Sequence, residues 1–216
     1  MHHQRGYTVL YTTYYAESNS ITTERYTEMK NALMLKGQKK DYQEFHLRKL
    51  EFLGSNMKNA VANYFLCIKN HDTSQIFLEK KYVQNGLYYK KCTKITLEEC
   101  SRIIAGQLDW MKGSRKELLA DFYRQATLNN LYPGRVTDYQ REMCRYRKGE
   151  YVTFTTSIER GVGQCRSITE EPEVKISCLD EDKVLLIYKK AASIPQVVSN
   201  MLQGQESQSE DYAFAF

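Results

Sequence analysis

Polar and apolar residues alternate with a period of two along several stretches of the chain, a pattern typical of strands with one buried face. The alternation predicts strands over residues 61–70, 75–84, 87–95, 135–145, 150–158 and 183–190, and a further strand over residues 7–15. Asn85-Gly86 and Lys148-Gly149 each fall between two consecutive strands, and an Asn-Gly pair is typical of a tight hairpin turn. The strands on either side of each turn are therefore expected to be antiparallel neighbours.

Helical patterns interrupt these strands. Thr96 and Ser114 are each followed by a Glu three residues later, which is the spacing of a capping box at a helix start. Helices are also predicted over residues 22–35 and after Pro195. Because strands dominate, the predicted fold class is α+β, an antiparallel β-sheet or β-barrel with flanking helices.

The composition fits this class and excludes others. The chain has 17 Tyr and only 3 Pro, which suits strands, and 42% hydrophobic with 26% charged residues is typical of globular proteins. No internal repeat or flexible linker is found, so residues 1–216 are expected to form a single domain. No apolar run is long enough for a transmembrane segment, and the start lacks a hydrophobic signal region, so a cytoplasmic protein is expected.

The net charge and the spacing of the cysteines limit which partners and metal sites are expected. The formal net charge of +5 allows an anionic partner but is too small to indicate nucleic acid, so no nucleic-acid partner is expected. The 6 Cys include no C-x-x-C pair and the 4 His are scattered, which argues against a zinc site and for free thiols.

Strand alternation also sorts the charged residues into faces. One face of each of three predicted strands carries several charges: Glu79 with Lys81, Lys90 with Lys94, and Arg135 with Arg141 and Arg145. Since a hairpin joins the first two strands, these side chains are expected on one surface. Two interpretations remain open, a solvated sheet face or a barrel whose charged interior receives a polyanion.

Several motifs occur in a recognisable order. Residues 77–96 contain an E-x-K strand, an N-G turn and a Y-K-K strand that leads into a helix, and similar matches follow at 132–142, 151–161, 185–202 and 209–212. Together they resemble the VTC domain, the polyphosphate-polymerase domain of vacuolar transporter chaperone proteins. The resemblance covers residues 55–216, with weaker agreement at 7–15.

This resemblance implies a triphosphate-tunnel (CYTH-like) barrel that binds nucleoside triphosphate and polyphosphate and transfers the γ-phosphoryl group with Mn²⁺ or Mg²⁺. Its cations are expected to grip phosphate oxygens, since phosphoryl transfer depends mainly on positioning and charge neutralisation. The residues that match the phosphate-binding positions of the family are Glu79, Lys81, Lys90, Lys91, Arg141 and Lys189, with Lys90 and Arg141 as the catalytic candidates.

The chain also departs from the family pattern. Positions that are charged in the family are occupied here by Asn63, Phe65, Cys67, Tyr151, Thr155 and Ile187. Ile187 stands where the family has its metal-binding Glu, and Asp211 stands where it has a lysine. The first strand of the family domain is expected to be missing. A charge-assisted hydrogen bond contributes about 1.5–3 kcal/mol, so losing four such contacts would cost at least about 6 kcal/mol, or four decades of affinity. Whether the chain is an enzyme is therefore left open. The alternative is an inactive module that binds polyphosphate or a protein partner.

Overall fold

The structure is a computed structural model, and it is described here over residues 9–13, 16–36, 42–54, 62–84, 87–147, 150–189 and 196–202. The helices and strands, in chain order, are β1 (Val9–Thr13), β2 (Ala16–Thr22), α1 (Thr23–Lys36), β3 (Tyr42–Leu53), β4 (Ala62–Lys69), β5 (Ile76–Gln84), β6 (Leu87–Ile95), α2 (Leu97–Ile104), the 3-10 helix η3 (Asp109–Met111), α3 (Glu117–Asn129), β7 (Tyr132–Arg147), β8 (Glu150–Gly161), β9 (Lys175–Ser177), β10 (Lys183–Lys189) and α4 (Gln196–Leu202). None of the helices in these segments is long and apolar enough to span a lipid bilayer.

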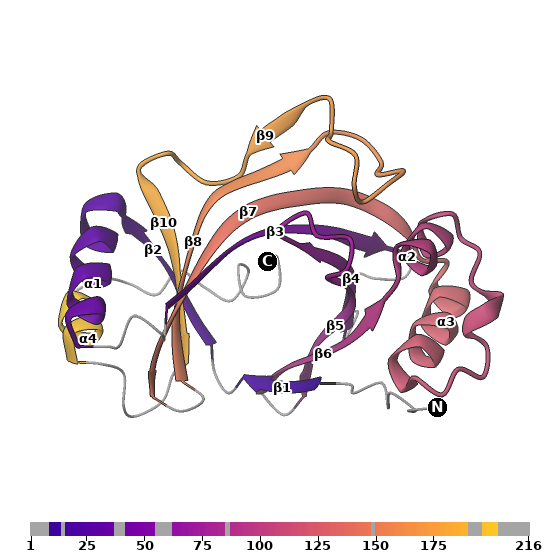
Figure 1. Ribbon diagram of the computed structural model, residues 1–216, viewed down its shortest axis with the longest axis horizontal. Coiled ribbons are helices and arrows are strands. Elements are labelled where there is room, and N and C mark those ends of the chain that lie inside the picture. The colour runs from indigo at the N-terminus through magenta and orange to yellow at the C-terminus, as the bar shows by residue number, and fades with distance from the viewer. Residues whose placement is uncertain are drawn as a thin grey trace.

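The strands form one antiparallel sheet that curves into an arch (Figure 1). Its order is β1-β6-β5-β4-β3-β7-β8-β10-β2, and β9 pairs with the far end of β8. β1 and β2 lie at opposite ends of this path although only residues 14 and 15 separate them in sequence. The described parts of β1 and β2 do not pair with each other. In place of the predicted barrel, the described strands therefore form an arched sheet that their hydrogen bonds do not close.

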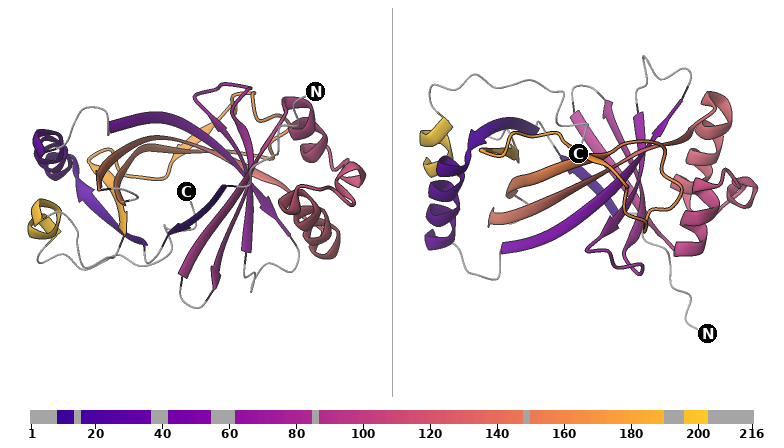
Figure 2. Two further views of the ribbon diagram at one scale, coloured as in Figure 1. Left: turned by 60° about the horizontal axis from the view of Figure 1, so that its bottom comes forward. Right: turned by 90° about the horizontal axis from the view of Figure 1, so that it is seen from above.

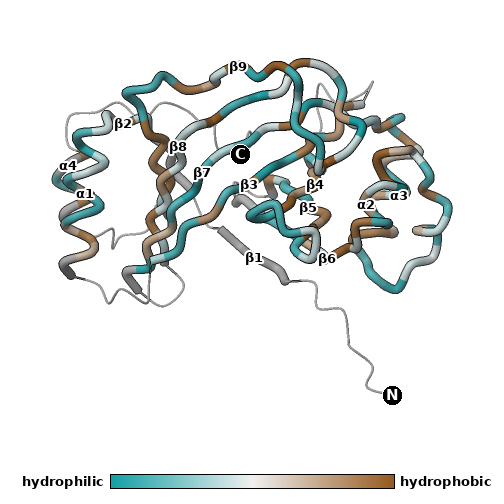
Figure 3. Tube along the Cα trace, turned by 45° about the horizontal axis from the view of Figure 1, so that its top comes forward, coloured by the Kyte–Doolittle hydropathy of each residue, from teal (hydrophilic) through white to brown (hydrophobic). Residues whose placement is uncertain are grey.

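Helices cover the outer, convex face of the arch at its two ends, as the views in Figure 2 show. α2, η3 and α3 pack against β4, β5 and β6, where Leu66, Leu78 and Phe122 belong to one buried apolar cluster. At the other end, Met29 of α1 and Val198 of α4 belong to a second cluster with β8 and β10. The opposite side of the sheet is its concave face, and the alternation along the strands in Figure 3 reflects these two sides.

Most predicted elements are confirmed. β6 has the predicted bounds, and β4, β5, β7, β8 and β10 differ from them by a few residues at their ends. β5 with β6 and β7 with β8 are antiparallel neighbours, although their turns lie outside the described residues. The capping box at Thr96 is present and opens α2, and α1 coincides with the helix predicted over residues 22–35.

The structure adds three strands that were not predicted and corrects one helix start. The added strands are β2, the short β9, and β3, a strand of 12 residues in the middle of the sheet. The strand predicted over residues 7–15 is found as β1, over residues 9–13, and β1 and β2 pair with different partners. Ser114 does not open a helix: its hydroxyl accepts from the backbone of Lys116, and α3 begins only at Glu117. The absence of the first family strand stays a prediction.

A buried arginine holds the segment after β8 against the outer face. Arg48 of β3 is fully buried and donates to both carboxylate oxygens of Asp138 on β7, at 2.7 and 2.9 Å. It also donates to the backbone oxygens of Ile168 and Glu170. At Gly161 this segment passes so close that an added Cβ would lie 2.7 Å from Pro172. These contacts fix β9 beside β8.

Candidate functional site

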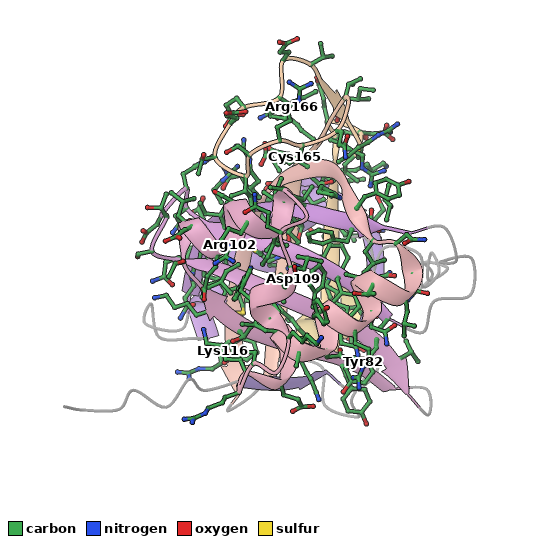
Figure 4. All side chains as sticks on the ribbon, turned by 90° about the vertical axis from the view of Figure 1, so that its right-hand side faces the viewer. Tyr82, Arg102, Asp109, Lys116, Cys165 and Arg166 are labelled. Atoms are coloured by element: carbon green, nitrogen blue, oxygen red, sulfur yellow. The ribbon has the colours of Figure 1, made fainter. Side chains whose placement is uncertain are left out.

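Strand alternation places the predicted cations on opposite sides of the sheet. On β5, Lys80 points outward and contacts Asp121 of α3 at 2.7 Å. On β6, Lys91 also points outward and contacts Glu117 of α3 at 3.2 Å. Its neighbour Lys90 lies on the other side of the sheet, the concave face, together with Glu79 and Lys81 of β5. Figure 4 shows the helical layer with Arg102, Asp109 and Lys116, which belongs to the outer side.

The centre of the concave face is a buried carboxylate between two lysines. Glu79 of β5 lies 2.9 Å from the Nζ of Lys49 on β3 and 2.5 Å from the Nζ of Lys90 on β6. The side chains of Glu79 and Lys49 are 5% and 4% exposed, whereas that of Lys90 is 34% exposed. Lys90 is therefore the most exposed of the three side chains.

The pKa shifts reflect a local excess of positive charge. Burial would raise the pKa of Glu79, but Lys49, Lys90 and Lys81 outweigh it and hold the pKa well below its usual range. Burial and the neighbouring ammonium of Lys49 lower the pKa of Lys81 well below that of a free lysine, although Glu79 opposes this. Lys90 and Arg141 lower the pKa of Lys81 further. Protonation of Lys81 is therefore resisted until an added anion offsets its cationic neighbours.

Arg141 of β7 completes this group, which we call the cation cluster (Lys49, Lys81, Lys90 and Arg141). The Nε of Arg141 donates to the hydroxyl of Thr155 on β8 at 3.2 Å, and its guanidinium lies 4.7 Å from the ring centroid of Tyr139. Its Nη2 is buried and has no hydrogen-bond partner among the described residues. No ion pair joins Arg141 to a carboxylate in the part of the chain that the structure describes. An unpaired buried guanidinium nitrogen is the kind of donor that an anion would satisfy.

Part of the concave face is apolar. Phe65 and Cys67 of β4 are buried at positions where the family pattern has cations. The Phe65 ring centroid lies 5.5 Å from the Nζ of Lys49 and 5.1 Å from that of Lys81. Across β7, β8 and β10 runs an apolar cluster of Tyr139, Ile158 and Leu185, with Leu47, Ile187, Cys178 and Leu179 packed against it. The cations therefore lie mainly on the wall formed by β3, β5 and β6.

The described residues do not fit the divalent metal that the resemblance implies. Mg²⁺ and Mn²⁺ prefer oxygen ligands, chiefly carboxylates. Each oxygen of Glu79 already lies beside a lysine ammonium, and Ile187, at the expected carboxylate position, packs in the apolar cluster. Within the described ranges, no group of three or more His, Cys, Asp or Glu could hold a metal ion.

Four of the six predicted phosphate-binding residues come together, namely Glu79, Lys81, Lys90 and Arg141. Lys91 does not join them, because it lies on the outer side of the sheet. Lys189 ends β10, but its side chain lies outside the described residues, so its role stays a prediction.

Lys49 was missed because β3 was not predicted. An alternation typical of a strand is present, since Lys49 and Glu51 alternate with Leu50 and Phe52. The adjacent charged residues Arg48 and Lys49 interrupt it, although both are buried in the structure. Alternation cannot show two neighbouring charges buried on opposite faces, since such a pair normally indicates a solvated segment.

Two solved structures share the fold of this chain. A proposed adenylyl cyclase from Hippeastrum, described as having a dominant triphosphatase activity, is 10% identical with a TM-score of 0.53, and the match covers 92% of each chain. A proposed adenylate cyclase from Bacillus halodurans is 9% identical with a TM-score of 0.56, and the match covers 94% of this chain and 97% of that one. Both share the triphosphate-tunnel type of fold with this chain.

The amino-acid sequence identifies the family more specifically than the fold does. A search of curated proteins finds no match. The family model of the VTC domain matches residues 55–211, which is most of the chain and includes β4 to α4. This chain therefore belongs to the VTC-domain family.

Proposed function

We propose that the concave face binds the phosphate chain of a nucleoside triphosphate or of polyphosphate. The observation that carries this proposal is the cation cluster, in which Lys49, Lys81 and Lys90 lie around the buried carboxylate of Glu79 and Arg141 lies near the lysines. Burying an excess of like charge is costly unless a counter-ion compensates it. A polyanion that reaches Lys90 and the unpaired Nη2 of Arg141 would supply that compensation.

The geometry favours phosphate over other anions. Arg141 offers a planar guanidinium, whose donors match the oxygens of a phosphate group, and Lys90 offers a partly exposed point charge. The cations come from β3, β5, β6 and β7, so they face one another across a curved surface rather than form a flat patch. Such an arrangement suits successive phosphate groups of one chain.

Family membership also favours transfer of the γ-phosphoryl group to a polyphosphate chain. In that reaction the bond between the β-γ bridging oxygen and the γ-phosphorus breaks, and a terminal phosphate oxygen of the chain bonds to the same phosphorus. Lys90 and Arg141 would neutralise charge on the transferred group, and Lys49 with Lys81 would hold neighbouring phosphates. No protein nucleophile is needed for this direct transfer.

A second candidate function is binding without turnover. It is favoured by Ile187, which occupies the expected metal-ligand position and packs against Leu185 and Ile158. Measuring whether [γ-³²P]ATP is converted to labelled polyphosphate or free phosphate, with and without Mn²⁺, separates the two candidates. Turnover above the rate without protein supports the polymerase, and its absence under conditions where ATP binds supports the inactive module.

The binding itself is tested by thermal-shift titration with tripolyphosphate and with ATP. Lys90→Met and Lys91→Met form a matched pair, since these adjacent residues lie on opposite faces. Losing one charge-assisted contact costs about 1.5–3 kcal/mol, so Lys90→Met is expected to weaken binding by about 10- to 100-fold. Lys91→Met should leave it within about twofold, since its exposed ion pair contributes little. Absence of saturable stabilisation, or an equal loss in both variants, would contradict the proposal.

A further inference from the structure

The space between the carboxylates of Glu51 and Glu79 on the concave face holds the side-chain nitrogens of two lysines. The strand register pairs Glu51 with Phe65 and Phe65 with Glu79, so Phe65 lies between the two acidic residues. The Nζ atoms of Lys49 and Lys81 lie 5.5 and 5.1 Å from the centroid of the Phe65 ring. Two lysines therefore occupy the place in which a divalent cation would have to bridge these carboxylates.

The carboxylate of Glu79 is not available to a metal without a rearrangement. A metal at Glu79 would have to displace Lys49 or Lys90, and Lys49 is almost fully buried. Displacing it would leave a buried ammonium unpaired, which is strongly unfavourable. Burial raises the pKa of Glu51, while Arg160 and Lys81 oppose that shift, so its environment is already cationic. A dication added here would meet like charge from Arg160.

On the basis of the proposed function, we propose that this site takes tripolyphosphate or a nucleoside triphosphate as the metal-free anion, and that Mg²⁺ or Mn²⁺ weakens its binding. The cation cluster does the charge neutralisation that a bound metal would otherwise do. Each dication on the phosphate chain cancels two negative charges and occupies oxygens that Lys90 and Arg141 would contact. Mg²⁺ thus competes with the protein for the ligand instead of joining the two.

Isothermal titration calorimetry with tripolyphosphate tests this, with EDTA in one arm and saturating Mg²⁺ in the other at matched ionic strength. We expect the Kd, referred to total tripolyphosphate, to rise about tenfold or more with Mg²⁺, which corresponds to about one lost charge-assisted contact. Titration with Mg²⁺ alone is expected to give no saturable heat. An unchanged Kd, or tighter binding with Mg²⁺, overturns the inference.

A carboxylate variant tests whether any effect of Mg²⁺ on binding arises at Glu79. If Glu79 holds a metal, Mg²⁺ should tighten binding in the native protein, and Glu79→Gln or, if that variant does not fold, Glu51→Gln should abolish the gain. If the inference is correct, Mg²⁺ weakens binding in the native protein and in either variant. Binding that appears only with Mg²⁺ overturns this inference but leaves the proposed function standing. Absence of binding in both arms overturns the proposed function, and this inference with it.

Discussion

Replacing the central carboxylate gives a quantitative test of the charge arrangement. Glu79→Gln keeps the size of a side chain that is only 5% exposed but removes the negative charge beside Lys49 and Lys90. Breaking a buried ion pair from one side costs about 3–5 kcal/mol, since the remaining charge is left uncompensated. For a protein of this length, each kcal/mol shifts Tm by about 2–4 °C, so we expect Tm to fall by about 6–20 °C.

The matched control is Glu117→Gln. Its side chain is 77% exposed and contacts Lys91 on the outer face, so removing its charge should cost no more than about 1 kcal/mol. Thermal denaturation followed by circular dichroism measures both variants. Tripolyphosphate should raise the Tm of Glu79→Gln more than that of the native protein, because the anion replaces the missing charge. A loss no greater than that of the control, or a smaller response to tripolyphosphate, would refute the reasoning.

The stability difference between the native protein and Glu79→Gln should depend on pH, because the pKa of Glu79 is lowered. Lys49, Lys90 and Lys81 lower this pKa and outweigh the effect of burial. An acid with a lowered pKa in the folded state stabilises above its unfolded pKa, about 4.3 for Glu, and loses that contribution as pH falls toward the folded value. The difference in stability between the native protein and Glu79→Gln should therefore be constant from pH 7 to about 5 and shrink at lower pH.

Two further predictions concern other buried charges. Lys81→Met should raise Tm at pH 7, because burial and Lys49 lower the pKa of Lys81 and make its protonation unfavourable in the folded state. The gain should shrink as pH rises toward the unfolded pKa, about 10.4 for Lys, and equal gains at pH 7 and pH 10 in thermal denaturation would contradict this account. Arg48→Met should free the segment after β8 from Asp138, so trypsin should cleave at the exposed Arg166 at a higher rate than in the native protein. Unchanged cleavage, followed by mass spectrometry, would show that Arg48 does not hold that segment.

The sequence predicted the hairpin of β5 and β6 well, because an Asn-Gly pair and a period of two are local signals. The same period separated Lys90 from Lys91, and the structure confirms that they lie on opposite faces. The capping box at Thr96 was also predictable, since its hydrogen bonds join residues three positions apart.

What the sequence could not provide depends on contacts distant along the chain. Arg48 is buried because Asp138 and the backbone near residue 170 satisfy its guanidinium, and no local pattern contains those partners. Lys49 is buried for the same kind of reason, through Glu79. The separation of β1 from β2 depends on pairing with β6 and β10, which are far along the chain. The candidate site was therefore predicted from β5, β6 and β7 but without its most buried lysine.

A crystal structure determined with tripolyphosphate would test the central claim most directly. The account predicts phosphate oxygens within hydrogen-bond distance of the Nη2 of Arg141 and of the Nζ of Lys90, on the concave face of the sheet. Lys91 on the outer face should make no contact with the ligand. Phosphate bound only outside the cation cluster, or an empty concave face at a concentration that saturates binding in solution, would contradict it.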